Sequence, residues 1–256
     1  MKNIEETSYK LKSGQEVRLP LRYKNWKWMM ATFTAPVKQV KKILPSKIKP
    51  ILVTPNKALI SFGALQYPEV SDLEPYDEFL ISIPVQYSPP INIPFLPLFF
   101  NPLFPQKVYK KGASYIYHLP VTTEESCKAG SEIWGFPKVV REMKFEENEK
   151  TKSCWLIDEG KEILSIEIEK TPVSKNKKDF IYCSYTEKDD QLLLTCIHAN
   201  GNYGIKNMTG KASVKWGTGK ITEELKKLSL SKRPIQVFFA EKLESALPLA
   251  DESLPS

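Results

Sequence analysis

The sequence predicts an α+β fold that is rich in β-strands, in which one large antiparallel or mixed sheet closes as a barrel and a few short helices interrupt the strands. Short segments rich in Ile, Val, Tyr and Leu recur along the chain, and several alternate apolar and polar residues with the period of a half-buried strand. Twenty prolines against eleven glycines argue against one long helical bundle. With 256 residues and no visible linker or repeat, residues 1–256 are expected to form a single domain.

Eight segments are expected to be strands, and the clearest alternation is Leu-Ser-Ile-Glu-Ile at residues 164–168. The pair Asp189-Asp190 and the segment Asn200-Gly201-Asn202 have the composition of hairpin turns. The expected strands are residues 58–65, 79–87, 114–121, 153–157, 163–168, 180–185, 192–198 and 235–240.

Three short helices are expected between the strands. The first lies within residues 34–44, where a threonine and a proline precede apolar residues that share one helical face. The second begins near Thr122, which has capping-box spacing to Glu125, and Gly130 suits its exit. The third covers residues 222–228.

Composition limits the classes of partner. The formal charge is +7, but the lysines are scattered among acidic residues and no nucleic-acid-binding motif accompanies them, so no nucleic-acid partner is expected.

Residues 79–106 carry no charge and contain seven prolines. That proline density is incompatible with a membrane-spanning helix. A strand at 79–87 and an apolar loop at 89–105 are expected instead, and the loop must be covered by the protein's own core or by a subunit interface.

The cysteines and histidines predict neither disulfides nor a metal site. Four cysteines lie far apart without a C-x-x-C pair, and no apolar leader is visible, which favours reduced thiols in a cytoplasmic protein. The only histidines, His118 and His198, have no ligand at metal-site spacing. The cysteines are Cys127, Cys154, Cys183 and Cys196.

Lys138 is the residue whose surroundings favour covalent chemistry. It follows a proline-containing turn and is flanked by apolar side chains, including Trp134, Phe136 and Val139. Burial disfavours the charged form of an amine. A neutral amine can attack a ketone and form an imine, also called a Schiff base. A lysine beside aromatic residues can also simply lay its stem along them.

The segment from Gly130 to Lys138 resembles the active-site motif of the acetoacetate decarboxylase family: a Gly, a variable residue, a Glu, a short apolar stretch, an aromatic and then Pro-Lys. In that family the lysine forms the imine with a β-keto acid, and it falls on Lys138. Tyr76-Asp77-Glu78 resembles the segment that contributes an active-site glutamate, which falls on Glu78. The resemblance implies the family's double-cone barrel, a homo-oligomer with residues 89–105 as a candidate interface, and no cofactor.

Three positions depart from the family pattern. A second lysine usually follows the imine-forming one, and here Val139 stands in its place. A family arginine falls on Trp26 by ungapped matching, and a second family glutamate falls on Gly63. Trp26, Gly63, Val139 and the aromatic residues Trp134 and Phe136 are therefore expected around the substrate pocket.

The expected activity is decarboxylation of a β-keto acid similar to acetoacetate, through a Lys138 imine and with Glu78 assisting proton transfers. The imine nitrogen is itself the electron sink, so no cofactor is required. Two alternatives stay open: a Schiff-base aldolase or dehydratase that acts on a larger keto acid, and a non-catalytic barrel that binds a small molecule.

Overall fold

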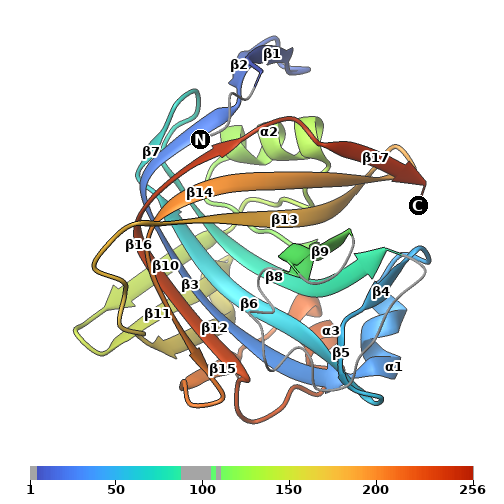
Figure 1. Ribbon diagram of the computed structural model, residues 1–256, viewed down its shortest axis with the longest axis vertical. Helices are drawn as coiled ribbons and strands as arrows, with labels where there is room; N and C mark the ends of the chain where they lie inside the picture. Colours follow the sequence, from blue (N-terminus) through green and yellow to red (C-terminus); the bar gives the residue numbers. More distant parts are fainter. Residues whose placement is uncertain (1–4, 88–104, 108–110, 256) are drawn as a thin grey trace.

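The computed structural model describes residues 5–87, 105–107 and 111–255. Seven strands close into a mixed barrel in the order β8-β9-β13-β14-β16-β3-β6, and β6 pairs with β8 to complete the ring. Figure 1 shows these long strands curving around one another. The predicted β-rich barrel is confirmed. The barrel strands are β3 (Leu21–Pro36), β6 (Lys57–Tyr67), β8 (Tyr76–Tyr87), β9 (Gly112–His118), β13 (Lys178–Lys188), β14 (Gln191–Asn207) and β16 (Gln236–Leu247).

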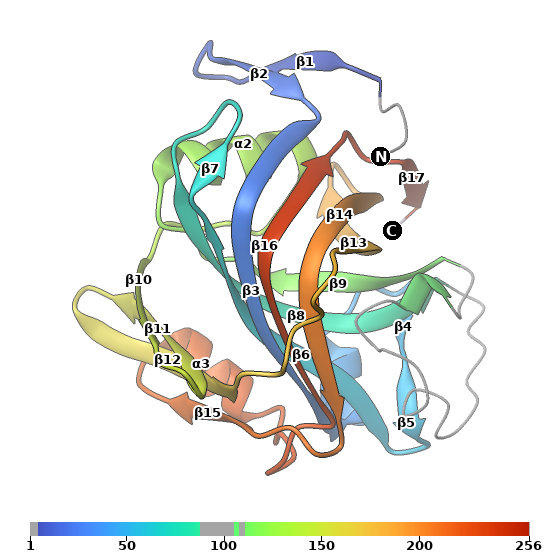
Figure 2. The same ribbon diagram turned by 60° about the vertical axis from the view of Figure 1, so that its left-hand side comes forward.

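The pairings around the barrel are antiparallel except between β13 and β9, which run parallel. A separate four-stranded antiparallel sheet packs beside the barrel (Figure 2). Its strands are β10 (Glu142–Glu147), β11 (Thr151–Asp158), β12 (Lys161–Glu169) and β15 (Ala212–Trp216). The remaining strands are β1 (Thr7–Lys10), β2 (Glu16–Leu19), β4 (Ile48–Pro50), β5 (Leu52–Thr54), β7 (Glu69–Val70) and β17 (Glu252–Pro255).

The barrel wall separates two apolar clusters, because successive side chains of a strand point to opposite faces. On β3, Trp26, Trp28 and Met30 belong to the cluster on one face. Met29 and Phe33 belong to the cluster on the other face, which also contains apolar side chains of β11 and β12. The first cluster contains the cavity described below.

Three short helices lie where they were expected, with differences at their ends. Helix α1 (Val37–Val40) continues as a 3₁₀ turn, η1 (Lys41–Ile43), and helix α3 spans Lys220–Lys226. Helix α2 (Glu124–Trp134) is capped by Thr123 rather than Thr122. Figure 1 shows α2 at one end of the barrel, and α1 and α3 at the other.

Two predicted breaks lie inside regular elements. Gly130 is not the exit of α2, because the helix continues for another turn to Gly135, which has the left-handed φ of 66°. Asn200-Gly201-Asn202 does not form a hairpin, because it lies within β14 where the register against β16 shifts. Asp189 and Asp190 do join β13 to β14, with φ angles of 50° and 57°.

The prediction of four reduced thiols is wrong for two cysteines. Cys183 on β13 lies directly opposite Cys196 on β14, and their sulfur atoms form a disulfide. Residues directly opposite each other on neighbouring strands have Cβ atoms close enough for a disulfide to join their sulfur atoms. Spacing in the sequence does not reveal which residues lie opposite each other. Cys127 and Cys154 are free.

Two other expectations concern residues 79–106. The expected strand at 79–87 is the greater part of β8, whereas the apolar loop at 89–105 lies outside the described residues except for Pro105. Within the described part of the chain, no helix is long and apolar enough to span a membrane.

Candidate active site

Helix α2 and the segment after it position Lys138. The hydroxyl of Thr123 accepts a hydrogen bond from the amide of Ser126, and two glutamates occupy the first turn, where the helix dipole favours negative charge. At the other end, the amide of Phe136 donates to the carbonyl of Gly130 at 3.2 Å. This reversal at Gly135 turns the chain back along α2 and carries Lys138 over the helix.

Lys138 forms an ion pair with Glu78 inside the protein. Lys138 Nζ lies 3.0 Å from Glu78 Oε2, and the two side chains are 5% and 9% exposed. The same amine lies 4.9 Å from the ring centroid of Tyr76 and 5.7 Å from that of Phe136. A cation at this place is therefore stabilised by one carboxylate and by two aromatic faces.

Tyrosine hydroxyls surround the carboxylate side of the pair. Tyr67 and Tyr76 are buried, and their hydroxyls face a site that already holds the charge of Glu78. Burial, followed by the charge of Glu78, raises the pKa of Tyr67 well above 10.0, and burial likewise raises the pKa of Tyr76. The hydroxyls of Tyr23 and Tyr76 lie 3.3 Å apart. These tyrosines stay protonated at neutral pH and can donate hydrogen bonds.

The pair faces a buried, largely apolar cavity. The cavity has a volume of about 60 Å³, which is enough for a few ordered water molecules. Among the described lining residues only Lys138 and Glu78 carry charge. The others are Leu21, Tyr23, Trp26, Trp28, Leu65, Tyr67, Leu73, Tyr76, Leu80, Ile116, Leu119, Ser126, Gly130, Trp134, Phe136, Phe180, Tyr182, Ser184, Ile197, Ala199, Ser245 and Leu247.

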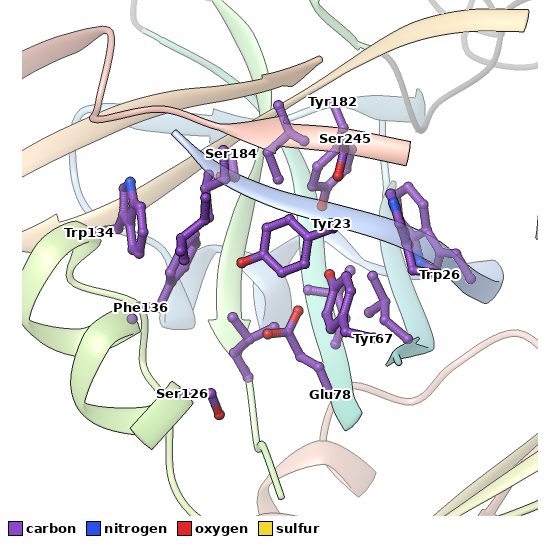
Figure 3. Close-up of a pocket in the computed structure, with 18 of the residues that line it drawn as sticks. Tyr23, Trp26, Tyr67, Glu78, Ser126, Trp134, Phe136, Tyr182, Ser184 and Ser245 are labelled. Atoms are coloured by element: carbon purple, nitrogen blue, oxygen red, sulfur yellow. The ribbon is translucent and has the colours of Figure 1, made fainter. Parts of the chain in front are cut away.

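The structure brings most of the predicted site residues together. Lys138, Glu78, Trp134, Phe136 and Trp26 all line the cavity. Figure 3 shows Tyr23, Tyr67 and Glu78 between Trp26 on one side of the pocket and Trp134 and Phe136 on the other.

Val139 and Gly63 are not among the lining residues, contrary to expectation. Val139 is 39% exposed, because it follows Lys138 in a segment whose backbone pairs with Val121, so its side chain points the other way. Gly63 lies in the barrel wall, where an added Cβ would fall 2.7 Å from the carbonyl oxygen of Met29. The wall has no room for a glutamate at this place.

Sequence reasoning missed the tyrosines and Trp28. Tyr76 and Glu78 lie two residues apart on β8, and Trp26 and Trp28 lie two apart on β3, so each pair shares one face. Tyr76 could have been predicted, because alternate residues of a strand share a face with Glu78. Tyr67 could not, because only the pairing of β6 with β8 brings it to the cavity.

Comparison with known proteins identifies the family of the chain. The family model described as acetoacetate decarboxylase (ADC) matches residues 8–246. The chain belongs to the acetoacetate decarboxylase family. Its similarity to a crystal structure of acetoacetate decarboxylase from Legionella pneumophila gives a TM-score of 0.61 at 17% identity, covering 90% of this chain and 86% of that one. The sequence matches none of the curated proteins with which it was compared.

Two other solved structures share this fold. A further acetoacetate decarboxylase structure aligns with a TM-score of 0.63 at 14% identity, covering 92% of this chain and 89% of that one. The enduracididine biosynthesis enzyme MppR complexed with pyruvate aligns with a TM-score of 0.59 at 10% identity, covering 95% and 96% of the two chains. At these identities the likeness establishes the fold alone.

No group of three or more His, Cys, Asp or Glu side chains in the described part of the chain is arranged to hold a metal ion. Instead, the site of this family member offers an amine, a carboxylate, phenol hydroxyls and aromatic faces. These groups suit imine chemistry on a carbonyl compound.

Proposed function

We propose that this protein cleaves a carbon–carbon bond of a small β-keto acid through an imine at Lys138, releasing CO₂. The observation that carries the proposal is the 3.0 Å contact between Lys138 Nζ and Glu78 Oε2 at a buried apolar cavity. A nucleophilic amine needs a base within hydrogen-bonding reach to take its proton, and Glu78 is in that position.

The reaction begins with a proton transfer from the ammonium of Lys138 to the carboxylate of Glu78. The pair stays neutral overall, so the transfer leaves no uncompensated charge in the cavity. The neutral amine attacks the ketone carbon, and the resulting carbinolamine loses its hydroxyl as water with the proton that Glu78 holds. A protonated imine and a Glu78 carboxylate remain.

The protonated imine then accepts the electron pair of the breaking bond. CO₂ leaves, and the pair moves to nitrogen to give an enamine. A proton from water, relayed by Glu78, adds to the enamine carbon, and hydrolysis releases the ketone and frees Lys138. The faces of Tyr76 and Phe136, 4.9 and 5.7 Å from the amine, favour the cationic imine over the neutral enamine.

A second candidate is an aldolase or dehydratase that uses the same imine without losing CO₂. One observation favours it. Lys138 is the only basic residue among the described residues that line the cavity, and it is paired with Glu78. Once the imine has formed, its protonated nitrogen pairs with Glu78, so a substrate carboxylate has no cation of its own, whereas an uncharged carbonyl compound needs none. A structure of similar fold, that of MppR, holds the condensation product of pyruvate and imidazole 4-carboxaldehyde, which joins a keto acid to an aldehyde.

The assay that tests the proposal measures CO₂ release from acetoacetate by the wild type and by Lys138→Met. The wild type is expected to release CO₂ faster than buffer, and Lys138→Met to fall to the buffer rate. Lys128→Met is the matched control, because Lys128 is an exposed lysine on α2, and it should keep the wild-type rate. Equal rates for the wild type and Lys138→Met would exclude decarboxylation through this lysine.

The role of Glu78 is tested with Glu78→Gln, which keeps the shape of the side chain and removes the proton acceptor. A general base typically contributes about 10²–10⁴-fold, so the rate of CO₂ release should fall by that order. A Glu78→Gln rate within about twofold of the wild type would show that the carboxylate only holds Lys138 in place.

A further inference from the structure

Two indole N–H groups in the cavity wall have no hydrogen-bond acceptor within the described part of the chain. Trp26 and Trp28 lie two residues apart on β3 and both line the cavity. They are 4% and 2% exposed, and neither Nε1 atom has a partner among the described residues. A buried donor without an acceptor is unfavourable, and most buried donors in proteins are satisfied.

Trp134 provides a comparison within the same cavity. It is 1% exposed, but its Nε1 donates to the carbonyl of Pro248 at 2.7 Å. Burial of an indole in this cavity is therefore compatible with a satisfied N–H. The two unpaired donors are both on β3, and Figure 3 shows Trp26 on the side of the pocket away from Trp134.

The two indoles are connected to the Lys138–Glu78 pair through neighbouring rings. The ring centroids of Trp26 and Trp28 are 6.0 Å apart, and that of Trp26 is 5.4 Å from Tyr67. Tyr67 is in turn 4.9 Å from Tyr76, whose ring faces the Lys138 amine. Trp26 and Trp28 thus line the same cavity as the Lys138–Glu78 pair, with Tyr67 and Tyr76 between them and the amine.

We propose that Trp26 and Trp28 form a subsite for an uncharged hydrogen-bond acceptor, such as a carbonyl or ester oxygen, at the far end of a substrate with an apolar middle. The inference rests on the proposed imine at Lys138 for the position of the substrate's other end. The acceptor is uncharged because Lys138, the one basic residue among the described lining residues, already faces Glu78. An indole N–H donates a hydrogen bond without bringing a compensating charge.

The test uses three methyl esters of keto acids, namely methyl 3-oxobutanoate, 4-oxopentanoate and 5-oxohexanoate, so that three spacings between ketone and acceptor are sampled. Each ester is compared with the straight-chain methyl ketone of equal length and with its free keto acid. The readout is the concentration that gives half-maximal labelling of the protein on borohydride reduction. For at least one ester, the half-maximal concentration should be about 3- to 10-fold lower than that of the matching ketone, which is the range expected for one net hydrogen bond. It should also be lower than that of the free keto acid.

Three variants assign the preference. Trp26→Phe and Trp28→Phe keep an aromatic ring and remove the N–H, and each is expected to lower the ratio of ketone to ester concentrations toward one. Trp155→Phe is the matched control, because Trp155 lies on β11 and is not among the described residues that line the cavity, and it should keep the wild-type ratio. Using a ratio within each variant cancels general losses of affinity or folding.

The inference and the proposed function fail in different ways. If the ligands label Lys138 but no ester is favoured over its ketone, or if both β3 variants keep the wild-type ratio, the subsite is wrong and the imine stands. If no ligand labels the protein, quenching of tryptophan fluorescence supplies the same comparison. If fluorescence quenching shows tighter binding of the ester than of the ketone, and Trp26→Phe and Trp28→Phe lose this preference, the subsite is supported in a protein that forms no imine. If quenching shows no preference for the ester, the subsite is overturned.

Discussion

The side chain of Lys138 occupies the space that a side chain at Gly130 would fill. A Cβ added to Gly130 would lie 2.5 Å from Cδ, 2.6 Å from Cε and 3.1 Å from Nζ of Lys138. Gly130 is thus a glycine inside a helix because the lysine stem crosses the helix there, one turn before the helix ends. The contact links the glycine that begins the family motif to the lysine that ends it.

Gly130→Ala is expected to disable the amine while leaving the fold intact. The new methyl group would displace the stem of Lys138 and move its amine away from Glu78, whereas alanine favours the helix by about 1 kcal/mol over glycine. Labelling by acetoacetate and borohydride should slow by at least about tenfold, and the thermal midpoint should fall, because separating the buried pair costs more than the helix gains. Lys128→Ala, on an exposed face of the same helix, should change neither quantity. Wild-type labelling by Gly130→Ala would show that the amine does not depend on this contact.

The buried pair should show strong coupling in stability. Lys138→Met leaves Glu78 buried without its cation, and Glu78→Gln leaves Lys138 without its carboxylate, so each single variant is expected to lose about 3–5 kcal/mol of unfolding free energy. The double variant should lose less than the sum, with a coupling of about 1–3 kcal/mol. Urea denaturation of the wild type, the two single variants and the double variant measures this coupling. Additive losses would mean that the two groups do not interact in solution.

The disulfide predicts a specific labelling pattern. Iodoacetamide applied after unfolding without reductant should modify two cysteines, Cys127 and Cys154, and four after reduction. The bond joins residues 13 apart in sequence, so replacing both Cys183 and Cys196 by alanine should lower the unfolding free energy by about 3 kcal/mol. Four modified cysteines without reductant would contradict the pairing.

Glu147 should make the protein sensitive to acid. Burial alone would raise its pKa, but hydrogen bonds from Lys170 and Lys27, together with the charge and hydrogen bond of Lys152, outweigh it and lower the pKa from 4.5 to about 2. A carboxyl with a lowered folded-state pKa contributes stability above pH 4.5, and this contribution is lost as the pH falls toward 2. Glu147→Gln should therefore flatten the fall in stability over that range. An unchanged slope would show that the three lysines do not hold this charge.

The parts of the fold that were predictable depend on local pattern. Alternation located most strands, as at residues 164–168 in β12, and the paired aspartates located the turn before β14. Strand β3 was not predicted, because Trp26 to Met30 contains hardly any polar residue to mark the alternation, and both of its faces are buried. Asn200-Gly201-Asn202 has turn composition, but the pairing of β14 with β16 holds it in a strand.

The parts of the site that were predictable depend on one motif. Lys138 and Glu78 were found through the family resemblance, and the structure brings them to 3.0 Å. Tyr67 and Trp28 carry no local signal, since strand pairing alone brings them to the cavity. The Cys183–Cys196 disulfide also carries no local signal in the sequence, because only the register of β13 against β14 sets these residues opposite each other.

The most direct test of the central claim is to incubate the protein with acetoacetate, reduce it with borohydride and weigh the peptide that contains Lys138. An imine at this amine predicts a stable added mass on that peptide, retained by the Lys128→Met variant, whereas Lys138→Met should gain no mass anywhere. A modified lysine elsewhere, or an unmodified Lys138 peptide in a folded protein, would contradict the account.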